Sequence, residues 1–123
     1  MINRKDTKPI LLIDSDKFKR NALNTVLLRN GYECIAMGLG FQAMREIEMK
    51  PVSLAIVVNN FEDMPGIELS SLIKSNHPRI PVIQIAEYPD DEEENMALEA
   101  GIDFYIPDYA NKNFLLELIE KTL

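Results

Sequence analysis

The positions that could support chemistry in this chain of 123 residues lie where apolar runs give way to polar residues. Such ends fall at Asp14, Ser15, Val58, Ala86 and Asp108. Acids at these ends could hold Mg²⁺, which takes near-octahedral oxygen ligands that usually include one or two carboxylates. Asp14 offers one carboxylate, and Asp16 or Glu87 could add a second. Because this donor set is thin, we interpret these acids as surface carboxylates and predict no metal site.

Val58 is the most informative of these positions because its side chain is a hydrocarbon. A valine has no lone pair that could act as a nucleophile or a metal ligand, and it has no titratable proton. Ala86 also lacks a hydrogen-bonding group, and Asp108 brings a negative charge. We therefore assign no catalytic residue to this set and predict that the chain is not an enzyme.

Strands and helices alternate five times along the chain, and these elements must position the residues above. Apolar runs predict strands at residues 10–13, 32–37, 54–58, 81–86 and 104–106. Single helices between successive strands imply right-handed crossovers and a parallel sheet with helices on both faces. We expect an α/β fold of the flavodoxin-like (βα)5 type, a three-layer sandwich with strand order 2-1-3-4-5. Its site lies beyond the carboxyl ends of strands one and three.

Helix signals agree with this plan. Five residues recur at helical spacing and predict the face of the first helix that packs on the sheet: Phe18, Ala22, Leu23, Val26 and Leu27. Gly31 and Gly101 follow helical segments and suit a left-handed conformation at the helix end. The acidic run at residues 90–94 precedes the fourth helix, where negative charge meets the positive end of the helix dipole.

Composition narrows the class of protein. A chain of this length is expected to form a single domain over residues 1–123, alone or as the N-terminal part of a longer protein. The net charge of −7 argues against nucleic-acid binding. Cys34 is the single cysteine, which excludes an internal disulfide and suits a reducing compartment. Since no membrane span or signal peptide is evident, we expect a cytoplasmic domain.

Several motifs agree in order and spacing with those of one family. Residues 10–16 resemble a first strand followed by an acidic pair, and residues 66–69 resemble the start of a third helix. Residues 81–83 match the opening of a fourth strand, and residues 97–105 match the end of the fourth helix and the fifth strand. Together they cover about residues 8–122. The chain resembles the receiver domain of response regulators (CheY-like), the phosphorylatable module of two-component signalling and phosphorelays.

The resemblance implies a phosphorylation pocket with most of its parts replaced. Active receivers use two adjacent acids that hold Mg²⁺, an acceptor Asp, a Thr or Ser hydroxyl and a Lys ammonium, because the transferred group is anionic. The matching positions in this chain are Asp14, Ser15, Val58, Ala86 and Asp108. Only Asp14 retains the family's residue type. The resemblance therefore implies a degenerate pocket without a metal or other cofactor.

Two neighbours could replace the missing acceptor. Asn59 follows Val58, but its amide is a poor nucleophile, and in a strand it would point to the opposite side. Asp63 lies five residues beyond Val58, and the family match places it in a loop outside the pocket. We expect neither to accept a phosphoryl group.

Two further positions bear on signalling. Tyr105 aligns with the family's switch aromatic, which turns inward when the hydroxyl engages phosphate. Ala86 offers no such coupling, so an amphipathic ring at a strand end is the simpler interpretation of Tyr105.

The family's Lys is commonly followed by a proline after a cis bond. Here Tyr109 follows Asp108, so we expect a trans bond.

We therefore predict a phosphorylation-independent pseudo-receiver. The resemblance implies a protein partner, or a homodimer, bound through the fourth helix, fifth strand and fifth helix, roughly residues 95–123. The charges there are mainly acidic, so a basic partner surface is plausible. No nucleic acid, membrane or small-molecule substrate is expected. The alternative is a phosphorylatable receiver with a displaced carboxylate. A flavin or nucleotide enzyme would need a Gly-rich loop after the first strand, where Asp14-Ser15-Asp16-Lys17 stands instead.

Overall fold

A five-stranded parallel sheet in the order β2-β1-β3-β4-β5 forms the centre of the protein. The computed structural model describes residues 8–108 and 111–123. The strands are β1 (Ile10–Asp14), β2 (Cys34–Met37), β3 (Leu54–Val58), β4 (Val82–Ala86) and β5 (Phe104–Pro107). The helices are α1 (Lys17–Arg29), α2 (Gly40–Met49), α3 (Gly66–Asn76), α4 (Asp91–Glu99) and α5 (Lys112–Thr122). This order confirms the predicted flavodoxin-like fold.

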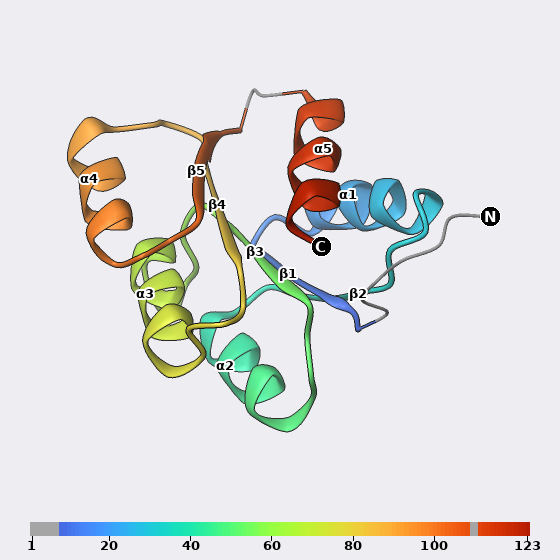
Figure 1. Cartoon of the computed structure of the whole chain (residues 1–123), viewed down its shortest axis with the longest axis horizontal. Coiled ribbons are helices and arrows are strands. Elements are labelled where there is room, and N and C mark those ends of the chain that lie inside the picture. The colour runs from blue at the N-terminus through green and yellow to red at the C-terminus, as the bar shows by residue number, and fades with distance from the viewer. Residues whose placement is uncertain (1–7, 109–110) are drawn as a thin grey trace.

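Helices cover both faces of the sheet and make three layers. Helices α1 and α5 lie on one face, and α2, α3 and α4 lie on the other (Figure 1). Side chains along β3 alternate between the two sides. Val57 packs in the core with Leu69 of α3, whereas Val58 packs in the core with Leu115 of α5. Burial on both faces explains why β1, β3 and β4 are so rich in apolar residues.

The register brings the carboxyl ends of four strands to one rim. Asp14 lies opposite Val58 in the β1–β3 pair, and Val58 lies opposite Ile85 in the β3–β4 pair. Ala86 lies opposite Pro107 in the β4–β5 pair. Parallel pairing therefore gathers at one edge the positions that the sequence singles out.

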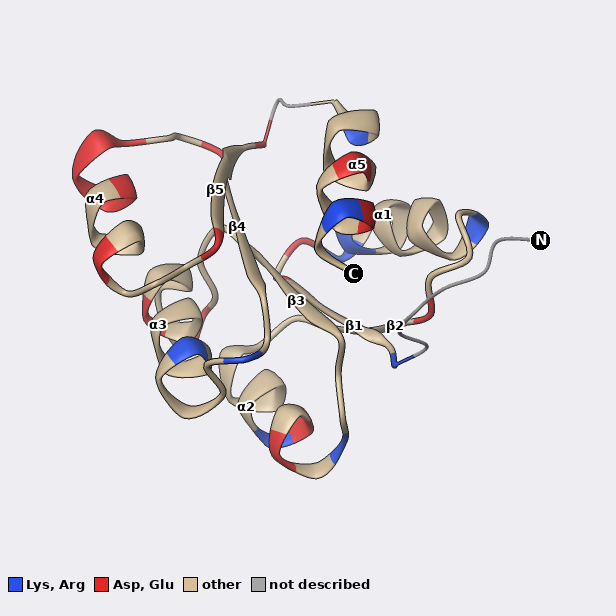
Figure 2. Cartoon of the chain, viewed as in Figure 1, with Lys and Arg blue, Asp and Glu red and all other residues tan. Residues whose placement is uncertain are grey.

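Side chains and glycines set the helix ends as expected. Asp16 caps α1, where its Oδ1 accepts hydrogen bonds from the amides of Phe18 and Lys19 at 3.0 and 3.1 Å. Asp90 caps α4, whose first turn is entirely acidic (Figure 2). Gly31 and Gly101 have φ values of 86° and 81°, which confirms their left-handed conformation.

The predicted packing face of α1 is wrong at its start. Phe18 is 86% exposed and Ala22 is also exposed, whereas Leu27 is fully buried. Phe18 and Ala22 line an open cavity between α1 and α5, so they lie on the sheet side of the helix without packing against the sheet. Strand β2 is also shorter than expected, because the Tyr32 amide bonds to the Leu27 carbonyl at 3.0 Å and belongs to the helix end.

Two close contacts attach α3 to the sheet. The Cβ of any side chain at Gly66 would lie 1.7 Å from the carbonyl oxygen of Asn59, so only glycine fits there. Gln84 is a buried polar residue in β4, and its Oε1 accepts a hydrogen bond from the Ser70 hydroxyl of α3. These contacts fix α3 against β3 and β4.

Within residues 8–108 and 111–123, no helix is long and apolar enough to cross a bilayer. The Asp108–Tyr109 bond, which we expect to be trans, lies outside the described residues.

Candidate functional site

Two adjacent cavities open at the carboxyl ends of the strands, and they share Asp14 and Lys19. The polar cavity has a volume of about 390 Å³, and its lining includes Ser15, Asn59, Ala86 and Glu87. The apolar cavity has a volume of about 290 Å³ and lies between α1, α5 and the strand ends. The five positions singled out from the sequence all line these cavities. Asp14 lines both cavities, Ser15 and Ala86 line the polar one, and Val58 and Asp108 line the apolar one.

Asp14 is a buried acid at the end of β1. It is 4% exposed, and its Oδ1 accepts a hydrogen bond from the Asp16 amide at 2.9 Å. Burial is the largest influence on the pKa of Asp14 and raises it above its ordinary value; the Asp16 and Asp108 charges act in the same direction, and the Asp16 amide and the Lys19 charge oppose them. This carboxyl therefore carries its negative charge less readily than a surface acid.

Val58 places hydrocarbon at the end of the central strand. Its side chain is 3% exposed and belongs to the core that joins the sheet to α1 and α5. It also forms part of the wall of the apolar cavity, beside Ile85 and Ile106. The end of β3 therefore presents no group that could attack an electrophile or bind a metal.

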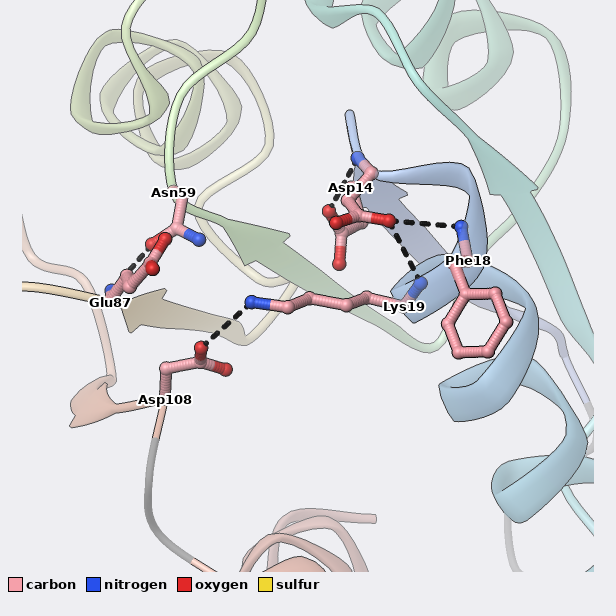
Figure 3. Close-up of polar contacts among 7 residues, drawn as sticks. Asp14, Phe18, Lys19, Asn59, Glu87 and Asp108 are labelled. Carbon is pink, nitrogen blue, oxygen red and sulfur yellow. Dashed lines mark hydrogen bonds and ion pairs between the residues drawn. The ribbon is translucent and has the colours of Figure 1, made fainter.

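Lys19 is the site residue that sequence reasoning missed. Its Nζ lies 3.3 Å from Oδ2 of Asp108, across 89 positions of sequence. The Lys19 side chain extends from α1 across the ends of the strands to reach Asp108 (Figure 3). The Asp108 hydrogen bond raises the pKa of Lys19. The basic group around Lys17, Lys19 and Arg20 was the available signal, but that pattern is also typical of a solvated helix face.

Asn59 differs from its prediction. Strand β3 ends at Val58, and Asn59 adopts a left-handed backbone with φ 56°. Its Oδ1 accepts a hydrogen bond from the Glu87 amide at 2.5 Å, on the rim of the polar cavity (Figure 3). The expectation that it points away was wrong, because that expectation assumed strand geometry. The side-chain amide of Asn59 therefore links the end of β3 to the residue that follows β4.

Asp63 lies at the start of α2. Its two carboxylate oxygens accept hydrogen bonds from the amides of Gly40 and Phe41 at 2.9 and 2.8 Å. These bonds, with that from Phe41 the strongest, lower the pKa of Asp63. Both oxygens serve helix capping, and Asp63 does not belong to the lining of either cavity.

Tyr105 connects β5 to the start of α4. Its hydroxyl donates to Oε1 of Glu93 at 3.0 Å and accepts from the Asp90 amide at 3.3 Å. Burial raises the pKa of this phenol.

Residues 8–108 and 111–123 contain no group of three His, Cys, Asp or Glu side chains placed to hold a metal ion.

Curated relatives resemble the chain over most of its length. It is 28% identical over 112 residues to the response regulator FleR of Pseudomonas aeruginosa, covering 91% of this chain and 24% of FleR. It is 29% identical over 119 residues to the response regulator VraR of Staphylococcus aureus, covering 94% of this chain and 56% of VraR. The chain thus spans between a quarter and just over half of the length of these relatives.

Solved structures agree with the fold. A CheY-like receiver domain protein from Methanospirillum hungatei superposes with a TM-score of 0.89 at 28% identity, covering 94% of this chain and 93% of that one. The regulator TrrA of Thermotoga maritima, in complex with Mg²⁺ and BeF, gives a TM-score of 0.86 at 23% identity, with 94% and 99% coverage. The model of the response regulator receiver domain matches residues 10–120. The chain therefore belongs to the receiver domain family of two-component response regulators.

Proposed function

We propose that this receiver domain signals without being phosphorylated, as a protein-binding module. The observation that carries the proposal is the buried Val58 side chain at the end of β3, opposite Asp14. The family resemblance gives this position to the acceptor carboxylate. A hydrocarbon side chain cannot form an acyl phosphate, so the usual signalling reaction has no acceptor here.

The charges around Val58 also oppose the binding of a phosphoryl group. Asp14 and Asp108 bring negative charge to the rim, and the Lys19 ammonium already neutralises Asp108. A phosphoryl group in transfer is anionic and needs several positive or donor groups aimed at its oxygens. The Lys19 ion pair is a poor substitute for a metal ion, and Lys112, the other lysine of the apolar cavity, comes from α5 and not from the end of a strand.

The contacts of Tyr105 support a single resting conformation. Its hydroxyl bonds both to Glu93 and to the Asp90 amide, so turning inward would break two hydrogen bonds. Ala86 provides no hydroxyl to couple that rotation to a bound anion. We infer that Tyr105 secures α4 and is not moved by phosphate.

A displaced acceptor is the alternative function. Asp63 follows the end of β3 by five residues, but both its oxygens accept hydrogen bonds from the start of α2. Using it as an acceptor would require α2 to lose its cap. This cost favours the phosphorylation-independent proposal.

We further propose that the surface of α4, β5 and α5 binds a protein partner or a second copy of the chain. Three large apolar side chains are exposed on its helices, namely Met96, Leu98 and Phe114. Acids lie along both helices, most densely in the first turn of α4, and α5 also carries lysines, as the red and blue segments show (Figure 2). Exposed apolar side chains on mainly acidic helices suit a partner that offers apolar side chains among basic residues.

Phosphorylation can be tested directly by intact mass spectrometry. The protein is incubated with acetyl phosphate and Mg²⁺, beside an active receiver as positive control. We expect no adduct on the parent protein. The Val58→Asp variant shows whether the acceptor alone restores the reaction. A stoichiometric, acid-labile adduct on the parent, at Asp63 or elsewhere, would overturn the proposal.

The binding surface can be tested by charge reversal. Glu117 and Glu120 are exposed on α5, and Glu68 is exposed on α3 outside the proposed surface. We expect Glu117→Lys with Glu120→Lys to weaken self-association in sedimentation, or retention of the co-purifying partner, whereas Glu68→Lys does not. Equal behaviour of the two variants would contradict this surface.

A further inference from the structure

We propose that the apolar cavity between α1 and α5 binds a small amphiphilic carboxylate, with its hydrocarbon body against Val58 and its carboxylate at Lys112. This goes beyond the phosphorylation-independent function, because it assigns the domain an input of its own. The proposal stands on the lining, size and charges of this cavity.

The lining of the apolar cavity is hydrocarbon on three sides. Val58, Ile85 and Ile106 contribute the sheet wall, Leu23 comes from α1, and Leu115 comes from α5. An acid at position 58 would put a charge in this wall, and the valine removes it. The replacement that ends phosphoryl chemistry thus also makes the inner surface suitable for an apolar group.

The volume selects the size of the ligand. The cavity holds about 290 Å³. Ligand pockets begin at about 300 Å³, and a dry cavity of about 150 Å³ accepts one benzene ring. A molecule of about ten non-hydrogen atoms, such as an eight-carbon carboxylate, therefore fits.

The charges at the mouth select the head group. Lys19 and Asp108 neutralise each other as an ion pair. Lys112, the first residue of α5, makes no ion pair within the described part of the chain, and the dipole at the helix start adds positive potential. Asp14 repels an anion near β1, so a carboxylate is directed toward α5. A cationic head group would meet the unpaired Lys112.

A bound ligand would touch both helices on this face of the sheet. Ala22 and Leu23 of α1 and Leu115 of α5 lie on the same cavity. Occupancy would therefore fix the separation of α1 and α5. Since α5 also belongs to the proposed partner surface, ligand binding would alter partner affinity without covalent modification.

The test uses methyl and amide NMR spectra of the protein with sodium octanoate, below its micelle concentration. We expect dose-dependent shifts at Val58, Ile85 and Leu115. Octan-1-ol should bind more weakly, and octylammonium more weakly still. Lys112→Ala should weaken octanoate binding roughly fivefold and leave octan-1-ol unchanged, since an exposed ion pair contributes little more. Lys121→Ala, at the other end of α5, is the matched control.

A second pair of variants tests the position of the ligand. Ala22→Phe should block the mouth of the cavity and abolish the shifts, whereas Asn21→Phe, exposed on the same helix and outside the lining, should preserve them. The proposal is overturned if octanoate leaves these methyl signals unmoved, if octylammonium binds as well, or if both phenylalanine variants behave alike. Shifts at these methyl groups that appear only on concentrating the ligand-free protein would assign the cavity to a second copy instead.

Discussion

Asp14 and Val58 lie opposite each other at the ends of β1 and β3, so that a buried carboxyl faces a buried hydrocarbon. The two residues share the apolar cavity with Asp108 and Lys19. An acid at position 58 would be the third carboxylate in the lining of this cavity, beside Asp14 and Asp108, and the three would repel one another. The valine avoids this repulsion.

Val58→Asp should lower the free energy of unfolding at pH 7 by about 1 to 3 kcal/mol, the range for burying an imperfectly paired polar group. Desolvation and the charges of Asp14 and Asp108 oppose ionisation of the new acid. The loss should shrink at low pH as the new carboxyl takes up a proton. Urea unfolding measures both effects, with Val58→Thr as an uncharged control of similar shape. A variant as stable as the parent at pH 7 would contradict the prediction.

Asp14→Asn should stabilise the protein at neutral pH. Burial raises the pKa of Asp14, so the folded state binds a proton more tightly than the unfolded state. The parent therefore loses stability as the pH rises from the unfolded value of about 3.9 through the folded pKa. The asparagine retains an acceptor for the Asp16 amide but carries no charge. In urea titrations from pH 3.5 to 7, the advantage of the variant should grow with pH. A variant less stable than the parent at pH 7 would refute this.

Lys19 and Asp108 should couple weakly and in a salt-dependent way. Their side chains are 46% and 31% exposed, and exposed ion pairs contribute about 0.2–1 kcal/mol. A double-mutant cycle with Lys19→Ala and Asp108→Ala measures this energy at low and high salt. The exchanged variant, Lys19→Asp with Asp108→Lys, should recover part of the loss. Coupling that persists in 1 M salt would point to a contact other than this ion pair.

Gly66→Ala should destabilise the protein by about 2 kcal/mol or more, because the added methyl would overlap the Asn59 carbonyl and the backbone must move. Gly101→Ala is the matched control. A Cβ there has open space and bears only the cost of its left-handed φ, about 1 kcal/mol. Thermal melts of both variants give the comparison, and equal losses would show that the close approach at Gly66 is tolerated.

The sequence was sufficient for the elements and their order, because burial on both faces of a parallel sheet leaves a continuous apolar pattern. Strand β3 was predicted at its observed bounds, since apolar residues fill it and polar residues follow it directly. The start of α1 was predicted less well. Phe18 fits the helical spacing, but spacing alone does not reveal that this side of the helix borders an open cavity instead of packed core.

The candidate site was also predictable only in part from the sequence. Asp14, Ser15, Val58, Ala86 and Asp108 could be singled out because strand ends meet in a parallel sheet. The Lys19–Asp108 pair joins residues 89 positions apart through an extended side chain, and no local pattern encodes such a contact. The apolar cavity depends on how far α5 stands from α1, which is a property of packing.

The hydrogen bond between Ser70 and Gln84 has a mechanical consequence for the domain. It joins a helix to the middle of a strand inside hydrocarbon, where a stranded amide oxygen would find no water. Sliding α3 by one turn would separate the two groups, so this hydrogen bond holds α3 in register with β4. Any movement of α3 along the sheet would therefore have to break this hydrogen bond.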